Sequence, residues 1–140
     1  MKKLTATNEP FALDTNILIY LEGNDVSKRK IAEVLLSCDP VVPAQVIAEF
    51  INVTRRLRSS IPKRQLIAEA ADLFRHCLIA SLEQSTLDLA KVLIEKYDFQ
   101  IFDSIIIASA LEAGCNTLYS EDMQHNQLIE GKLKIVNPFL

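Results

Sequence analysis

Four acidic side chains stand at positions in the chain from which a fold could bring them together. Asp14 and Asp122 each follow a short apolar stretch, Asp103 precedes a long one, and Glu49 lies within a helical pattern. Carboxylates at contact distance repel one another, so such a cluster would need protons or cations. Mg²⁺ binds carboxylate oxygens and leaves positions free for phosphate oxygens. The chemistry of such a centre is phosphodiester hydrolysis by a metal-activated water, which needs no Ser, His or Cys nucleophile.

Each of these acids also has an ordinary structural explanation. An Asp before a helix commonly caps its N-terminus, which would suffice for Asp14. Asp103, in the first turn of a helix, would be favoured by the helix dipole. Glu49 would be a solvated residue on the polar side of its helix. The spacing alone therefore leaves the metal-centre explanation and the structural explanation open.

The elements that must position these acids alternate between short apolar strands and amphipathic helices. Strands are predicted at 11–14, 41–42, 78–80, 116–120 and 133–136. Helices are predicted from residue 15, then over 26–38, 43–58, 62–76, 83–97 and about 102–113. This alternation predicts an α/β fold, a short parallel sheet with helices on both faces. Because functional side chains gather beyond the carboxyl ends of such strands, Asp14 and Asp122 are expected at one edge. Residues 1–140 are expected to form one domain, with 1–9 as a short N-terminal arm.

The composition narrows the class of protein. The chain has 140 residues, of which 49% are hydrophobic and 24% charged, as in a globular domain with a buried core. No apolar run is long enough to cross a membrane, and no signal peptide is expected. Three widely spaced cysteines predict reduced, buried thiols and a cytoplasmic protein. Only three glycines occur, without a GxGxxG or P-loop motif. The net charge of −3 restricts any nucleic-acid contact to a local surface.

The chain resembles a known family through four motifs that occur in the family's order. They are FALDTNILIY at 11–20, VIAEFINV at 46–53, IFDSIIIASALEAGCNTLYSEDMQ at 101–124 and LKIVNPF at 133–139. Together they resemble PIN-domain proteins, most of all the VapC-type toxins of toxin–antitoxin pairs. The resemblance covers nearly the whole chain.

The resemblance implies a three-layer α/β/α fold and a Mg²⁺- or Mn²⁺-dependent endoribonuclease. The catalytic, metal-binding acids of the family would fall on the four acids named above. Asn16, two residues after the first acid, and Ser120, before the last ones, would orient them. The resemblance also implies RNA as the substrate, a homodimer, and a small antitoxin protein as the inhibitor.

Two positions depart from the family pattern, and neither removes an acid. Phe102 stands where the family often has Trp and is expected to remain a packing aromatic. Asn126 ends a QHN segment where the family commonly has QHG. Because Asn tolerates the left-handed backbone conformation better than most residues, the turn is expected to survive.

A basic cluster and two further polar residues complete the candidates. Arg55, Arg56 and Arg58, with Lys63 and Arg64 nearby, form the densest basic patch, and such a patch could contact RNA phosphates. Equally, these arginines are a solubilising helix end that complements its own dipole. Glu121 could be a fifth metal ligand but is expected to point away from the acids. His125, three residues after Asp122, could contact phosphate or metal but is expected to be a structural or surface residue.

Three other functions compete with the nuclease. A dehalogenase-like phosphatase would have a second acid at position 16, where this chain has Asn16, and a suitably placed lysine. A receiver domain would have an acidic pair at the first strand and a lysine after the last. A catalytically silent PIN-like module that binds RNA or protein would keep the fold without cutting.

Overall fold

The computed structural model describes residues 9–140, so the N-terminal arm predicted for 1–9 lies almost entirely outside the described residues. The strands are β1 (Phe11–Leu13), β2 (Val41–Pro43), β3 (Leu78–Ala80), β4 (Thr117–Tyr119), β5 (Leu128–Ile129) and β6 (Leu133–Val136). The helices are α1 (Thr15–Ile19), the 3₁₀ turn η2 (Tyr20–Glu22), α2 (Val26–Ser37), α3 (Ala44–Leu57), α4 (Lys63–Leu73), α5 (Gln84–Tyr97) and α6 (Ile101–Glu112).

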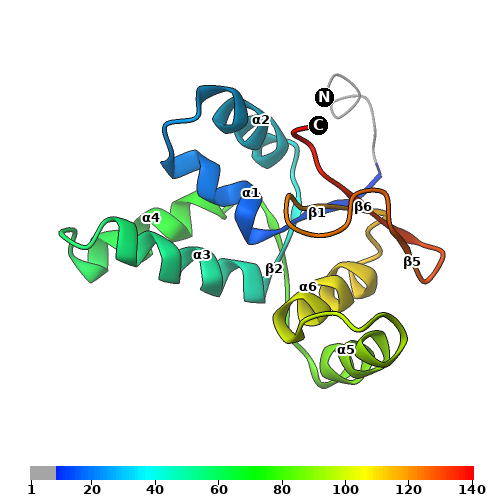
Figure 1. Ribbon diagram of the computed structural model, residues 1–140. Coiled ribbons are helices and arrows are strands. Elements are labelled where there is room, and N and C mark those ends of the chain that lie inside the picture. The colour runs from blue at the N-terminus through cyan, green and yellow to red at the C-terminus, as the bar shows by residue number, and fades with distance from the viewer. Residues whose placement is uncertain (1–8) are drawn as a thin grey trace.

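The strands form one six-stranded sheet in the order β3-β2-β1-β4-β6-β5. The central strand β1 is parallel to both neighbours, with Ala12 paired to Val41 of β2 and to Leu118 of β4. Helices flank this mostly parallel sheet, and α5 and α6 form a closely packed pair (Figure 1). The predicted α/β fold is confirmed.

The sheet and one helix differ in detail from the sequence prediction. β5 is antiparallel to β6 at an edge of the sheet and was not predicted, because two residues carry no readable alternation. The helix predicted over 62–76 ends at Leu73, and Phe74 caps it while packing edge-to-face on Phe50. A core contact therefore overrides the helical pattern at this end.

The core lies between the sheet and its helices. Residues 11–13 of β1 are all buried, which explains their continuous apolar run. The β-branched Ile106 and Ile107 lie in helix α6 and are almost fully buried. Their burial explains why a sequence with strand-like residues forms a helix: tertiary packing outweighs local propensity. The helix ends at Glu112, and Gly114 follows its cap residue with a φ of +78°, which suits glycine and agrees with its prediction as a helix stop.

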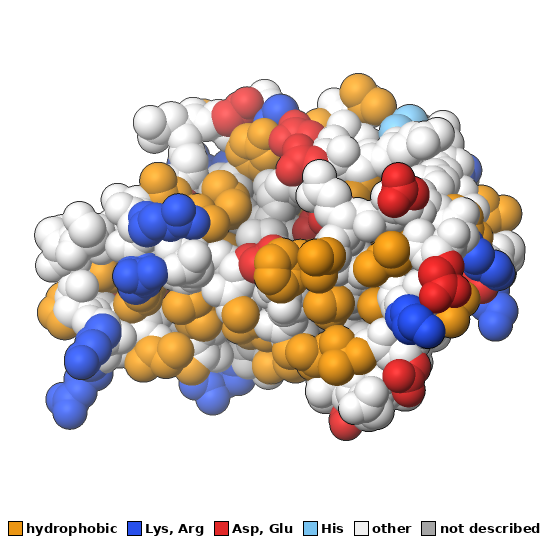
Figure 2. Space-filling view, turned by 60° about the horizontal axis from the view of Figure 1, so that its bottom comes forward, with side chains coloured by type: hydrophobic (Ala, Val, Ile, Leu, Met, Phe, Trp, Pro, Cys, Tyr) orange, Lys and Arg blue, Asp and Glu red, His pale blue; other side chains and the backbone are white. Residues whose placement is uncertain are grey.

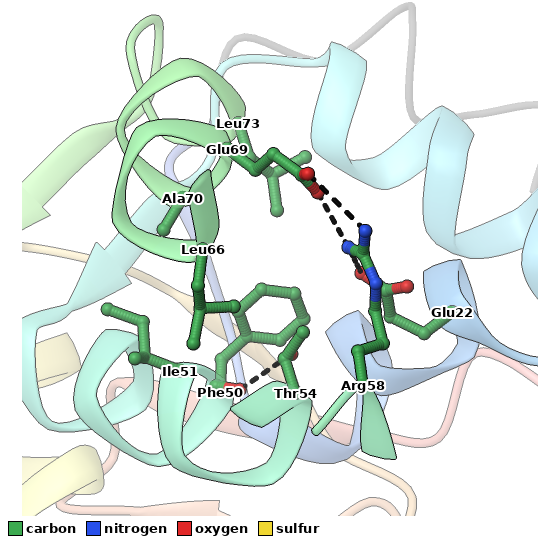
Figure 3. A pocket seen from close by; sticks show the side chains of 9 residues that line it. All are labelled: Glu22, Phe50, Ile51, Thr54, Arg58, Leu66, Glu69, Ala70 and Leu73. Atoms are coloured by element: carbon green, nitrogen blue, oxygen red, sulfur yellow. Dashed lines mark hydrogen bonds and ion pairs between the residues drawn. The ribbon is translucent and has the colours of Figure 1, made fainter. Parts of the chain in front are cut away.

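Helix α3, which carries Glu49, is held in place by α4. The two helices enclose a small pocket of about 100 Å³ that Phe50 and Leu66 line with other apolar residues. Figure 3 shows Arg58 reaching across the pocket mouth to Glu69, at 2.6 Å. This packing fixes α3 relative to α4, while contacts with β2 join α3 to the sheet.

Several apolar side chains lie outside the core. Ile67 on α4 and Leu87 on α5 occupy helical positions typical of a core, but 56% and 45% of their surfaces are exposed. The two exposed residues Leu78 and Ile79 belong to β3, which is an edge strand. Figure 2 shows apolar side chains gathered across the middle of the face that it presents. No helix within residues 9–140 has the length and apolar character needed to cross a membrane.

Candidate active site

Asp14 leaves the sheet at the end of its central strand. Its backbone N–H donates to the Tyr119 carbonyl at 3.0 Å, which continues the pairing of β1 with β4. Its side chain caps α1, with Oδ1 accepting from the Thr15 N–H at 2.7 Å. The capping explanation and the site explanation are therefore compatible, since one carboxylate oxygen serves the cap and the other faces Ser120.

The four predicted acids line one cleft of about 370 Å³. Asp14 enters it from the end of β1, Glu49 from α3, Asp103 from the first turn of α6, and Asp122 from the loop after β4. Because β1 and β4 are parallel neighbours, Asp14 and Asp122 emerge at the same edge of the sheet. Helices α1 and α3 pack together and bring Glu49 to that edge.

Asn16 and Ser120 hold the buried Asp14 carboxylate. The Ser120 hydroxyl donates to Asp14 Oδ2 at 2.8 Å, and Asn16 Nδ2 donates to the same oxygen at 3.1 Å. Asn16 Oδ1 accepts from the Glu121 N–H at 3.0 Å. Ser120 Oγ also accepts from the Met123 N–H at 3.2 Å. These bonds join the first acid to the loop that carries the last one.

Thr15 is a site residue that the sequence analysis missed. Its hydroxyl donates to Glu49 Oε1 at 3.2 Å, while its backbone N–H donates to Asp14. Thr15 therefore connects two acids that lie 35 residues apart in the chain. The only signal in the sequence was a hydroxyl directly after the first acid, and it was interpreted as the start of a helix.

The electrostatics of the cleft favour a cation. Burial raises the pKa of Asp14 from 3.8 to about 6; hydrogen bonds oppose this, while the nearby Asp103 and Glu49 charges add to it. Burial also raises the pKa of Glu49, with a contribution from Asp103. The pKa of Asp103 is raised by burial and by the charge of Asp122. Since none of the described residues lining the cleft is Lys, Arg or His, a bound cation would relieve this repulsion.

The donor set fits Mg²⁺ or Mn²⁺, because it consists of carboxylate oxygens supported by hydroxyl and amide groups. Across residues 9–140, no three His, Cys, Asp or Glu side chains already converge on a single metal position. Mg²⁺ is usually bound by one or two carboxylates and keeps several waters. A hydrated ion of this kind would need only some of the four acids as direct ligands.

Other predicted residues lie outside the cleft. Arg55 and Arg56 are exposed in the last turn of α3, where Arg55 donates to Asn52 at 2.6 Å. Glu121 points toward Tyr20 and Lys28, as expected.

Three further residues whose roles were predicted, His125, Asn126 and Phe102, also lie outside the cleft lining. His125 Nδ1 accepts from the Asn137 N–H at 2.9 Å, which is a structural contact. Asn126 adopts the left-handed conformation expected of it, with φ of +70°. The expectation that Phe102 packs against its neighbours was wrong, because 58% of its surface is exposed.

Comparisons with known proteins agree with this architecture. The PIN domain family model matches residues 11–129, so the chain belongs to the PIN domain family, as the motifs predicted. No curated protein sequence gives a significant match.

Three solved structures with a similar fold come from toxin–antitoxin systems. A toxin–antitoxin complex from Klebsiella pneumoniae has 22% identity and a TM-score of 0.67, over 91% of this chain and 96% of that one. VapC20 of Mycobacterium tuberculosis, named as a sarcin-ricin loop cleaving toxin, has 18% identity and a TM-score of 0.62, over 80% and 89%. VapBC2 from Rickettsia felis, bound to a promoter DNA fragment, has 19% identity and a TM-score of 0.58, over 89% and 96%.

The residues at the site argue against a dehalogenase-like phosphatase and against a receiver domain. Asn16 donates a hydrogen bond to Asp14, whereas the dehalogenase-like chemistry would place a second acid at that position. Among the described residues that line the cleft, no lysine is present to serve either alternative.

Proposed function

We propose that this protein is a Mg²⁺- or Mn²⁺-dependent endoribonuclease and the toxin of a toxin–antitoxin pair. The observation that carries the proposal is one cleft that four carboxylates from four separate segments line, with no cationic side chain among its described lining residues. Membership of the PIN family and the likeness to toxin structures support it. RNA would be the substrate, and a small antitoxin protein would be the partner.

The four acids of the cleft share one role in this proposal. Asp14, Glu49, Asp103 and Asp122 would hold the ion, directly or through its waters. A bound Mg²⁺ or Mn²⁺ supplies an activated water and neutralises charge on the phosphate oxygens.

Three neighbouring side chains would orient two of these acids through hydrogen bonds. Asn16 and Ser120 keep Asp14 oriented, because both donate to the same carboxylate oxygen. Thr15 orients Glu49 in the same way. Donation to a carboxylate favours its ionised form, which is the form that binds an ion.

The test of the proposed function uses purified protein and total RNA. With Mg²⁺ or Mn²⁺ present, we expect a few discrete cleavage products; EDTA should stop the reaction and excess metal should restore it. Intact RNA at all metal concentrations would contradict the nuclease proposal, and cutting that continues in EDTA would contradict the metal requirement. Binding of Mn²⁺ without cleavage would favour the silent RNA- or protein-binding module instead.

Removing the Ser120 hydroxyl is expected to weaken metal binding. Ser120→Ala deletes one donor to the buried Asp14 carboxylate, and such supporting contacts typically change metal affinity by about 10- to 100-fold. It also raises the pKa of Asp14 further, because the lost hydrogen bond favoured the ionised form. Calorimetric Mn²⁺ titrations from pH 5 to 8 should therefore show weaker binding and a midpoint at higher pH.

A matched control for this change is Ser109→Ala, which removes the hydroxyl of another buried serine, on α6. We expect its Mn²⁺ affinity to equal that of the wild type. Equal Mn²⁺ affinities for Ser120→Ala and Ser109→Ala would contradict a role of the Ser120 hydroxyl in metal binding.

We also propose that Arg55 and Arg56 contact RNA phosphates. Arg56 lies seven residues after Glu49 on α3, so it is two turns along the same side of the helix and about 10 Å away. A strand bound in the cleft could therefore continue along α3. Replacing both arginines with Gln is expected to weaken RNA binding and to lower the slope of log K against log salt by about 1–2.

The control for the arginine prediction is Arg75→Gln, which removes an exposed arginine paired with Asp72. Fluorescence anisotropy of an RNA probe at several salt concentrations measures both slopes. If the double variant and the control share the wild-type slope, Arg55 and Arg56 are only a solubilising helix end.

We further propose a homodimer, as the family resemblance implies. Supporting it, the exposed edge strand β3 presents Leu78 and Ile79, and the first turn of α6 presents Ile101 and Phe102. Multi-angle light scattering is expected to give twice the chain mass, and Ile79→Glu is expected to lower it. A monomeric wild type at micromolar concentration would contradict this part of the proposal.

A further inference from the structure

Asp122 differs from the other three acids in how it is held. Asp14 caps a helix, and Glu49 and Asp103 lie within helices, but Asp122 lies in the loop between β4 and β5. Within residues 9–140, no side-chain hydrogen bond to Asp122 itself holds it in place. Its position therefore depends on the conformation of its loop.

The neighbouring Glu121 anchors this loop through contacts with Tyr20 and Lys28, and none of these three residues lines the cleft. Its Oε1 accepts from the Tyr20 hydroxyl and its Oε2 accepts from Lys28 Nζ, both at 2.5 Å. Lys28 Nζ also donates to the Tyr20 hydroxyl at 3.2 Å. The ammonium lies 4.8 Å from the Tyr20 ring centre and 5.1 Å from that of Phe139, while the two rings pack edge-to-face.

The backbone of residue 121 is fixed at the same time. The Glu121 N–H donates to Asn16 Oδ1, and the preceding Ser120 N–H donates to the Val136 carbonyl at 3.0 Å. Glu121 is thus held by its main chain toward the cleft and by its side chain toward α2 and η2. A residue held on both sides leaves its neighbour Asp122 little freedom to leave the cleft.

We propose that Lys28, Tyr20 and Glu121 are positioning residues that fix the loop so that Asp122 completes the metal site. This inference rests on the proposed function in one respect, that Asp122 serves a divalent ion. A surface ion pair alone contributes little to stability. The purpose of this cluster is instead geometric: it joins α2 to a loop 93 residues later in the chain, directly beside a site acid.

The experiment compares two similar clusters in the same protein. Lys96 donates to Glu130 at 2.9 Å, and Tyr97 donates to the same carboxylate at 2.9 Å, but this second Lys–Tyr–Glu cluster is not beside the cleft. Lys28→Met and Lys96→Met therefore remove equivalent ion pairs. Lys28→Arg, which keeps the charge and can donate to Glu121, serves as the rescue.

We expect Lys28→Met to bind Mn²⁺ about 10-fold more weakly by calorimetry, in the range for residues that support a ligand. Amide hydrogen exchange at residues 121–123 should become faster, and saturating metal should recover most of the RNA cleavage. Lys96→Met should match the wild type in all three measurements, and Lys28→Arg should be close to it. Equal Mn²⁺ affinity and equal exchange in Lys28→Met and Lys96→Met would overturn the inference.

The failure of this inference can be told from failure of the proposed function. A wild type that binds Mn²⁺ but cuts no RNA contradicts the nuclease alone, and weaker Mn²⁺ binding by Lys28→Met would still support the positioning role. A wild type that cuts RNA while Lys28→Met keeps full Mn²⁺ affinity contradicts the positioning role alone. A wild type that binds no Mn²⁺ contradicts both.

Discussion

Asp14→Asn is expected to slow RNA cleavage by about 10³-fold or more. The change keeps the shape of the side chain but removes the charge of the most buried acid in the cleft. A bound metal supplies several kcal/mol of transition-state stabilisation, and each 1.4 kcal/mol corresponds to about a factor of ten in rate. Asp103→Asn is expected to have a similar effect, because Asp103 is also partly buried and feels the charge of Asp122. The measurement is the rate of product formation at saturating Mg²⁺.

The control for these losses is Asp88→Asn, which changes an exposed carboxylate on α5 that accepts a hydrogen bond from Gln84. Its rate should equal that of the wild type. Cleavage by Asp14→Asn or Asp103→Asn within about 10-fold of the wild-type rate would contradict the assignment of the site, since that is below the effect of losing a metal ligand.

Without metal, the same Asp14→Asn change is expected to stabilise the protein at neutral pH. The folded-state pKa of Asp14 is about 6, above the ordinary value of 3.8, so folding favours the protonated acid. The stability from this group is fully present below about pH 3.8 and is lost as the pH rises through 6. Above that pH, the buried charge costs about 3 kcal/mol, because one pKa unit equals 1.36 kcal/mol.

Asparagine carries no charge at any pH, but its single amide oxygen cannot replace both carboxylate oxygens, of which Oδ1 accepts from the Thr15 N–H and Oδ2 from Asn16 and Ser120. We therefore expect a gain of about 1–2 kcal/mol at pH 7.5, less than the full cost of the charge. Urea denaturation in EDTA at pH 5 and 7.5 measures it, and the gain should be smaller at pH 5. Added Mn²⁺ should make the wild type more stable than Asp14→Asn, because only the wild type gains binding energy from the ion. A variant less stable than the wild type at pH 7.5, or a pH-independent difference, would contradict the electrostatic description of the cleft.

Much of the arrangement of the acids could be predicted from the sequence. Asp14 and Asp122 follow buried strands, and parallel strands of one sheet end at the same edge, so their meeting followed from the alternation of strands and helices. Gly114 marked the end of α6 because a left-handed residue is needed there. These features depend on local patterns that the chain shows directly.

The rest depended on contacts between distant segments. Two examples are the hydrogen bond from Thr15 to Glu49 and the ion pair between Lys28 and Glu121. The partners lie far apart in the chain, and nothing in the local sequence around either one indicates the contact. The exposure of Ile67, Leu87 and Phe102 could not be predicted either, because apolar residues at helical spacing are ordinarily core residues.

Expression in cells tests the central claim most directly. Wild type, Asp14→Asn and Asp103→Asn would be induced in parallel without an antitoxin, and growth would be followed together with the 5′ ends of cellular RNA. We predict that the wild type arrests growth and produces new RNA ends at a few discrete positions, while both variants grow normally with intact RNA. Normal growth and intact RNA with the wild type, or the same cuts with either variant, would contradict the claim that these acids form a ribonuclease site.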